Sequence, residues 1–240
     1  NCLYVFTVRF KNIKIKEDAP DTPISFSKCS KISKYYELDN GRVWKADELE
    51  TTITNIDLDT IKAFYDFDEC VIFNAWEYIK SYLPLPIIQS VIKYYKNKTT
   101  LKDVQGEEEA YQLFKGFLNS IYGMMVSNIL HDNFTWGELY GWTSEKLTDL
   151  KDELDKYNNS SQRFLSYVWG VFITAYARRN LFSGILACGE DYIYSDTDSI
   201  KILNSDDHKD YIDNYNNMII KKLKTMCNTY KIDFSEVSPY

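Results

Sequence analysis

Apolar and polar residues alternate in several short segments of the first 80 residues, which is the pattern of half-buried strands. Residues 3–10 show it most clearly, and residues 23–26 form a weaker candidate. Residues 48–54 are rich in β-branched side chains and also predict a strand, as do residues 70–78. Asp57 can cap a short helix. Apolar side chains follow it at helical spacing; they are Leu58, Ile61, Phe64 and Tyr65. The pattern therefore predicts several strands around one short helix.

Two helices are predicted in the next 40 residues. The first begins near Pro86, with a stripe formed by Ile87, Ile88, Val91, Ile92 and Tyr95. It ends in the densest lysine cluster of the chain, which consists of Lys93, Lys96, Lys98 and Lys102. We interpret this cluster first as a solvated helix end, where cations also suit the helix dipole.

The second helix has two different faces. Glu107, Glu108 and Glu109 crowd its start, where the dipole favours anions. One side is apolar and contains Ala110, Leu113, Phe114, Phe117, Leu118 and Ile121. The opposite side carries Tyr111, Lys115, Asn119 and Tyr122. One cation, one amide and two phenols suit a nucleotide better than they suit a solvent face. Gly123 then ends the helical pattern or permits close backbone approach.

The pattern changes again between residues 128 and 167. Aromatic residues alternate with glycines and polar residues, which suggests a β-ribbon; they are Phe134, Trp136, Tyr140 and Trp142. Residues 147–157 form an acidic amphipathic helix. We interpret this region as an inserted subdomain, and a simple lid over the core is an equally good interpretation.

Residues 168–188 are apolar nearly all round and predict a buried helix that Gly189 stops. Thr174 and Arg178 lie one turn apart on it, either as a structural pair or within reach of a phosphate. A last helix is expected after Asp206 or Asp207, either of which can cap it. Its apolar stripe consists of Tyr211, Ile212, Tyr215, Met218, Ile219 and Leu223.

Residues 191–203 predict a β-hairpin with two aspartates near its tip. Runs of alternating Tyr and Ile flank a small polar centre that contains Asp196 and Asp198. In extended chain, residues two apart point the same way, so both carboxylates would face one spot and repel each other. A hard cation such as Mg²⁺ would remove that repulsion. An exposed Asp-rich turn is the other interpretation.

Composition limits these hypotheses. The chain has 240 residues, which is enough for one or two domains. Its formal net charge of −7 argues against non-specific nucleic-acid binding by bulk charge. A local basic track is still compatible with this net charge. Five scattered cysteines predict reduced thiols in a cytoplasmic setting. No apolar run is long enough to cross a bilayer.

Three segments resemble motifs of family B DNA polymerases, in the order of that family. Residues 194–199 resemble its Tyr-x-Asp-Thr-Asp-Ser motif, and residues 115–123 resemble its Lys-x-x-x-Asn-Ser-x-Tyr-Gly motif. Residues 174–178 resemble its Thr-x-x-Ala/Gly-Arg motif. The run leading to Arg178 and its short link to the hairpin narrow the resemblance to the protein-primed polymerases of bacteriophages and linear plasmids.

The resemblance implies a role for each matching residue. Asp198 would be a direct ligand and Asp196 a secondary one for two Mg²⁺ ions, with Mn²⁺ as an alternative. Lys115, Asn119 and Tyr122 would bind the incoming dNTP, and Lys98 would be a second triphosphate-binding lysine. The residues implied in DNA binding are Thr174, Arg178, Ser120, Gly123 and Tyr194.

The resemblance also implies an α+β fold, with a palm of antiparallel sheet packed on helices, helical fingers and inserted subdomains. Residues 1–83 would be partial palm with a terminal-protein-contacting insertion, and residues 84–127 the fingers. Residues 128–167 would be an insertion of the strand-displacement type, and residues 168–240 the palm with the catalytic hairpin. Because the motif Asp-x-x-Ser-Leu-Tyr-Pro does not occur, we expect an excerpt of an incomplete right hand, inactive alone.

The expected activity is therefore template-directed transfer of dNMP to a primer 3′-hydroxyl, in the host cytoplasm if the source is a phage. The expected partners are primer–template DNA, dNTPs and a terminal protein. An RNA-primed family B polymerase is the nearest alternative. A reverse transcriptase fits less well, because it would normally show Tyr-x-Asp-Asp. A decayed fragment that only binds nucleic acid is the non-enzymatic alternative.

Overall fold

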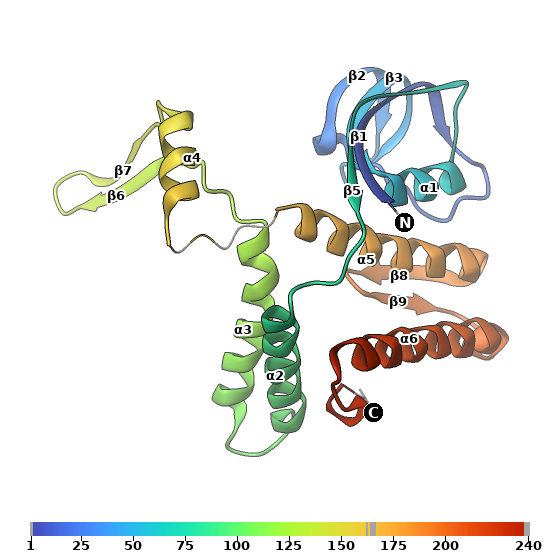
Figure 1. The fold of residues 1–240 in the computed structure, drawn as a ribbon. Helices are drawn as coiled ribbons and strands as arrows, with labels where there is room; N and C mark the ends of the chain where they lie inside the picture. The colour runs from blue at the N-terminus through green and yellow to red at the C-terminus, as the bar shows by residue number, and fades with distance from the viewer. Residues whose placement is uncertain (1, 162, 164–166, 238–240) are drawn as a thin grey trace. The chain divides into compact units, whose positions relative to one another are not determined.

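The computed structural model describes residues 2–161, 163 and 167–237. Contacts divide the chain into two compact units (Figure 1). The larger unit contains Asn1–Ile88 and Phe172–Tyr240, and the smaller unit contains Gln89–Val171. The mixed helical and antiparallel architecture confirms the predicted α+β class, whereas the predicted four-part division stays a prediction.

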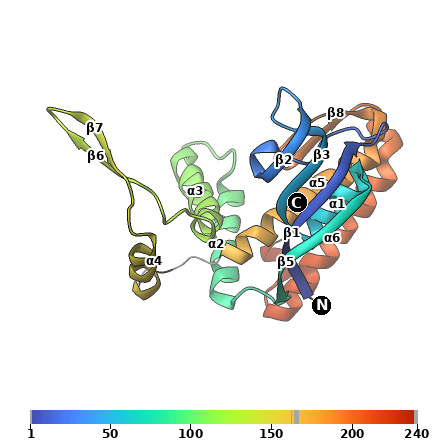
Figure 2. The same ribbon diagram turned by 90° about the horizontal axis from the view of Figure 1, so that it is seen from above.

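An antiparallel sheet forms one side of the larger unit (Figure 2). Its hydrogen-bonded order is β2-β3-β1-β4, and β5 also pairs with β1. The strands are β1 (Cys2–Ile15), β2 (Cys29–Glu37), β3 (Val43–Thr54), β4 (Tyr65–Asp66) and β5 (Glu69–Ile79). Along β1, Phe6, Val8 and Phe10 are buried at every second position, as the alternation predicted.

Helix α1 (Asn55–Phe64) begins with a capping box. The N-cap is Thr54, whose hydroxyl accepts a hydrogen bond from the backbone N–H of Asp57. The Asp57 carboxylate in turn accepts from the backbone N–H of Thr54 at 3.1 Å. The prediction that Asp57 is the cap was therefore wrong by three positions, because Asp57 is the reciprocal partner in the box.

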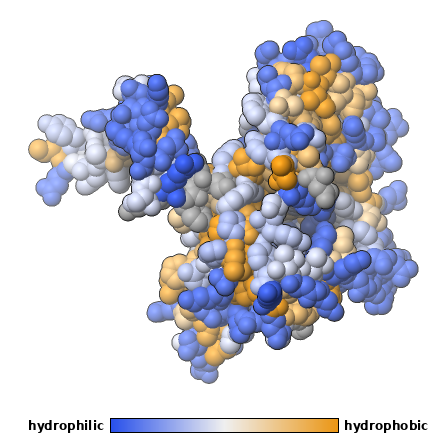
Figure 3. All heavy atoms as spheres, in the orientation of Figure 1, coloured by the Kyte–Doolittle hydropathy of each residue, from blue (hydrophilic) through white to orange (hydrophobic). Residues whose placement is uncertain are grey.

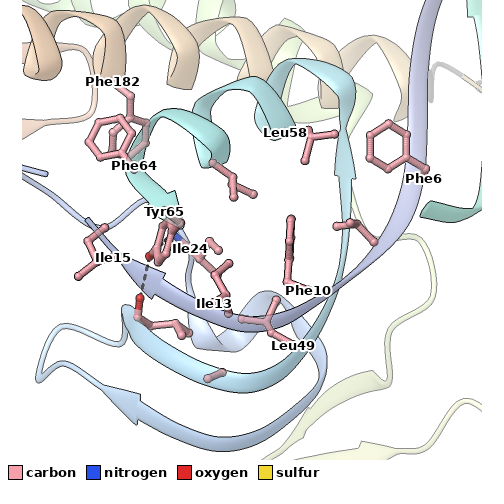
Figure 4. Close-up of a cluster of buried hydrophobic side chains, with 14 of the residues drawn as sticks. Phe6, Phe10, Ile13, Ile15, Ile24, Leu49, Leu58, Phe64, Tyr65 and Phe182 are labelled. Carbon is pink, nitrogen blue, oxygen red and sulfur yellow. Dashed lines mark hydrogen bonds between the residues drawn. The ribbon is translucent and has the colours of Figure 1, made fainter. Parts of the chain in front are cut away.

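The core of the larger unit lies between the sheet, α1 and helix α5 (Tyr167–Cys188) (Figure 4). Phe182 of α5 meets Phe64 of α1 edge to face, with 5.3 Å between ring centroids. Tyr65 is 1% exposed and donates its hydroxyl hydrogen to the carbonyl oxygen of Val43 at 2.7 Å. This bond satisfies both the phenol and a carbonyl group inside the core.

Three further expectations were wrong. Residues 23–26 form no strand: Ser25 makes an isolated bridge to Arg42 and a 3₁₀ turn follows. Helix α5 is not buried all round, since Ile173 is exposed on one side. Neither Asp206 nor Asp207 caps helix α6 (Lys209–Tyr230); its N-cap is His208, which forms no side-chain capping bond, and a 3₁₀ turn occupies Ser205–His208.

The predicted hairpin is confirmed. It consists of β8 (Tyr192–Asp196) and β9 (Ser199–Ile202), which pair antiparallel. Gly189, with φ of +51°, ends α5 and turns the chain toward the hairpin, as expected.

The smaller unit contains most of α2 (Leu85–Leu101), α3 (Glu108–Met125), a ribbon of β6 (Asn133–Gly137) with β7 (Gly141–Glu145), and α4 (Leu150–Asn159). Tyr94 of α2 packs against Phe114 and Phe117 of α3. The predicted ribbon is confirmed, with Trp136 and Trp142 paired across it. Gly123 lies inside α3, so the prediction that it ends the helix was wrong.

The five cysteines are free thiols.

Hydrophobic side chains are exposed over the sheet of the larger unit, where β5 contributes Val71 and Ile72 (Figure 3). Across the part of the chain that the structure describes, no helix has the length and apolar character needed to cross a bilayer.

Candidate functional site

The tip of the β8–β9 hairpin is a very tight turn. Asp196 pairs with Ser199, so only Thr197 and Asp198 connect the two strands. Thr197 has φ of +51°, and the backbone N–H of Asp198 donates to the carbonyl oxygen of Asp196 at 2.6 Å. This hydrogen bond spans two residues, as in a γ-turn. The segment is therefore not extended, and the argument that residues two apart point the same way does not hold here.

Both carboxylates of the tip are exposed. Asp196 accepts a hydrogen bond from the hydroxyl of Thr197 at 3.0 Å. No Lys, Arg or His of the described residues forms an ion pair with Asp196 or Asp198. The tip therefore presents two exposed carboxylates with which no described cationic side chain pairs.

These two carboxylates fit a hard divalent cation by donor type, because Mg²⁺ binds oxygen ligands and keeps several waters. Within residues 2–161, 163 and 167–237, no group of three or more His, Cys, Asp and Glu residues is arranged to hold a metal. Asp196 and Asp198 alone would accordingly supply only part of a cation site, and their predicted role as metal ligands stays a prediction.

A cavity of about 370 Å³ lies beside the tip. Its lining residues come from α5, the hairpin and α6; they are Ala177, Asn180, Leu181, Gly184, Thr197, Asp198, Ile200, Tyr211 and Tyr215. Gly184 permits the hairpin to approach α5, because a Cβ there would lie 2.5 Å from the Cδ1 of Ile200. The absence of this side chain therefore helps to shape the cavity that Asp198 lines.

The base of the hairpin is held by Asp191. Its carboxylate accepts from the Asn204 amide at 2.9 Å and lies 2.8 Å from Nε2 of His208. The hydrogen bond with His208, followed by that from Asn204, lowers the pKa of Asp191. Nothing in the sequence pattern indicated these contacts, since they join residues 13 and 17 positions apart across the hairpin.

Arg178 forms a bidentate pair with Asp57. Its Nε lies 2.9 Å from Oδ1 and its Nη2 lies 3.1 Å from Oδ2 of that carboxylate. The pair joins α5 to the first turn of α1 and lines a second cavity of about 640 Å³. The partner of Arg178 is thus Asp57, which the sequence did not indicate, and its predicted contact with DNA stays a prediction. Thr174 lies one turn earlier on α5 and is partly buried.

The remaining predicted residues lie on other elements. Tyr194 is exposed on β8 of the larger unit. The smaller unit contains the residues expected to contact nucleotide or DNA, namely Lys98 on α2 and Lys115, Asn119, Ser120, Tyr122 and Gly123 on α3. Lys115, Asn119 and Ser120 are exposed, whereas Lys98 and Tyr122 are partly buried. On the same helix Leu113 and Phe117 remain about half exposed, so the predicted apolar face is only partly covered.

No protein-family model matches the chain. It is 30% identical over 191 residues to the DNA polymerase of Bacillus phage phi29, covering 76% of this chain and 28% of that protein. It is 29% identical over 205 residues to the DNA polymerase of Bacillus phage Nf, covering 83% and 32%. The chain thus spans about a third of the length of these curated relatives.

Solved structures give the same comparison for the fold. Phi29 DNA polymerase complexed with primer–template DNA matches with a TM-score of 0.58 and 23% identity, covering 84% of this chain and 31% of that one. The same polymerase with primer–template DNA and incoming nucleotide substrates matches with a TM-score of 0.56 and 24% identity, covering 84% and 32%.

Proposed function

Because this chain belongs to the protein-primed family B DNA polymerases, the family of the phage phi29 enzyme, we propose that it forms part of a DNA-directed DNA polymerase. The reaction is transfer of dNMP from a dNTP to a primer 3′-hydroxyl, with release of pyrophosphate. The observation that carries the proposal is the pair of exposed, unpaired carboxylates on the γ-turn beside the cavity.

Asp198 and Asp196 would hold a divalent cation, preferably Mg²⁺. When bound, the cation supplies positive charge for the attacking and leaving oxygens of the transfer. The chain's own contribution is to fix Asp196 at the end of β8 and Asp198 in the turn that follows, so little reorganisation is needed on binding. Asp198 takes the more direct role because it lines the cavity, whereas Asp196 shares an oxygen with the Thr197 hydroxyl.

The exposed side chains of α3 would bind the incoming nucleotide. Lys115 offers a compact cation to the triphosphate, and Asn119 offers an amide one turn later on the same face. Tyr122 would lie under the sugar and base, as the resemblance implies. Lys98 of α2 would be a second phosphate ligand, although it is partly buried.

Arg178 would bind a DNA phosphate without leaving Asp57. The pair uses Nε and Nη2 of the guanidinium, and the side chain remains 46% exposed. Nη1 is then available to a phosphate, with the plane of the group fixed by the carboxylate. Thr174, Ser120, Gly123 and Tyr194 are the other proposed DNA contacts. A terminal protein and primer–template DNA are the proposed macromolecular partners.

Replacement of Asp198 by alanine tests the proposal in a polymerase whose polypeptide includes these residues. Loss of an outer-shell metal partner typically costs about 10–100-fold. Loss of a direct ligand is therefore expected to reduce primer extension by more than about 100-fold. DNA affinity and the unfolding transition should stay nearly unchanged. The matched control is Asp206→Ala, which removes an exposed carboxylate outside the hairpin and should leave extension unchanged. Extension by Asp198→Ala that stays at a few per cent of the wild-type rate or more would refute the assignment.

A further inference from the structure

The ring of Tyr176 on α5 forms cation–π contacts with two basic side chains. The Nζ of Lys80 lies 5.4 Å from the centroid of the Tyr176 ring, and the Cζ of Arg179 lies 4.9 Å from the same centroid. Lys80 follows directly after β5, whereas Tyr176 and Arg179 are three residues apart on α5 and share one of its faces. The ring therefore gathers positive charge from two segments that are distant in sequence.

A third cation comes from α6. The pKa of Lys222 is lowered by burial and, after that, by the charges of Arg179 and Lys80. Arg179, Lys80 and Lys222 thus lie close enough to repel one another. We name these three residues, together with Tyr176, the cation cluster.

The cation cluster has no protein counter-charge. None of its three cations forms an ion pair with a carboxylate of the described residues. The chain is nevertheless acidic, with 35 Asp and Glu against 28 Lys and Arg. Acidic partners are abundant, so three neighbouring cations without an ion pair, two of them over one ring, indicate an anion supplied from outside.

The position of the cation cluster suggests which anion. Arg179 donates from Nη2 to Oδ1 of Asn180 at 3.0 Å, and Asn180 lines the cavity that also contains Asp198. One hydrogen bond therefore joins the cluster to the wall of the proposed catalytic cavity. Lys80 and Lys222 are exposed, so the cluster is open along the surface and suits an extended polyanion better than an enclosed small ion.

We propose that Lys80 and Arg179, which lie over the Tyr176 ring, together with Lys222 bind backbone phosphates of a nucleic-acid strand next to the cavity that Asp198 lines. The proposal rests on the proposed function, but it concerns residues outside the three polymerase-like motifs. Their contacts would be sequence-independent, because phosphates carry no base information.

The salt dependence of DNA binding tests this site. Anisotropy titrations of a labelled primer–template would compare wild type with the triple variant Lys80→Gln, Arg179→Gln, Lys222→Gln. The slope of log K against log salt is negative, and each lost phosphate contact reduces its magnitude by about 0.7–0.9. The magnitude of the slope of the triple variant should therefore be smaller than that of wild type by about 2 to 3. The matched control removes the same charge from scattered, exposed lysines, in the variant Lys45→Gln, Lys62→Gln, Lys151→Gln.

Several outcomes separate the possibilities. An unchanged slope in the triple variant, or an equal fall in the control, would overturn the site while leaving the polymerase assignment intact. No DNA binding by wild type would instead overturn the proposed function. Displacement of the DNA by inorganic phosphate at constant ionic strength, in wild type but not in the triple variant, would assign the cluster to a free anion and overturn the strand assignment. The variant Arg179→Lys keeps the charge and should keep the slope.

Discussion

Gly184 of α5 faces the hairpin across a very short gap. A Cβ at this position would lie 2.5 Å from Cδ1 of Ile200 and 3.4 Å from the hydroxyl oxygen of Tyr211. The first of these contacts is too short for any real Cβ, so either Ile200 or the hairpin must shift. Ile200 lies two residues after Asp198, and the change Gly184→Ala therefore presses directly on the strand that carries the proposed catalytic tip.

The magnitude follows from two opposing effects. Alanine stabilises a helix interior over glycine by roughly 0.5–1 kcal/mol. Overpacking of a well-packed site costs typically about 1–3 kcal/mol. Because the clashing atom is the end of a flexible side chain, we take the lower half of that range. Gly184→Ala should thus lower the free energy of unfolding by at most about 1.5 kcal/mol.

A second substitution isolates the clash. Ile200→Val deletes the Cδ1 atom and costs about 0.5–1.5 kcal/mol alone. In that background the alanine meets no Cδ1, so its helix preference should make Gly184→Ala neutral or stabilising. The two changes should therefore couple favourably by about 1–2 kcal/mol, within the usual range for residues in contact. Urea unfolding of the four proteins measures this coupling, and additive effects would show that Ile200 does not limit the approach of α5.

Two further outcomes are expected from buried or bonded groups. Tyr65→Phe should lower the free energy of unfolding by about 1–3 kcal/mol, because the carbonyl of Val43 loses its buried donor. Urea unfolding measures this loss, and a change below the experimental error would contradict the prediction. The hydrogen bond with His208 lowers the pKa of Asp191 in the folded protein. This contact therefore stabilises the fold fully above the ordinary carboxyl pKa of about 3.9, and the stabilisation is lost as the pH falls through the lower folded-state pKa. The stability difference between wild type and Asp191→Asn should accordingly shrink below about pH 4, and a difference independent of pH would exclude this origin.

The hairpin was predictable from sequence because its period of two is local. The geometry of its tip was not, because Thr197 adopts φ of +51°, a conformation that threonine rarely takes and that no pattern of apolar residues reports. Asp57 illustrates a second limit. Thr54 and Asp57 are both good caps, and only the structure decides that they act together.

Contacts between distant segments explain the rest. The partner of Arg178 lies 121 positions earlier in the chain, and Lys80, which lies over the Tyr176 ring, follows directly after β5. Helical periodicity indicates which residues share a face but not which element covers that face. The motifs that contain Lys115, Arg178 and Asp198 could be recognised because each is a short run of consecutive residues. The residues of the cation cluster are scattered along the chain and form no such motif.

Three consecutive residues of α5 contact three different neighbours. Arg178 pairs with Asp57 of α1, Arg179 belongs to the cation cluster, and Asn180 lines the cavity with Asp198. Successive residues of an α-helix are rotated by about 100°, so three consecutive positions face three directions and can serve three sites within one turn. This use explains why α5 is apolar nearly all round and still carries polar residues at its centre.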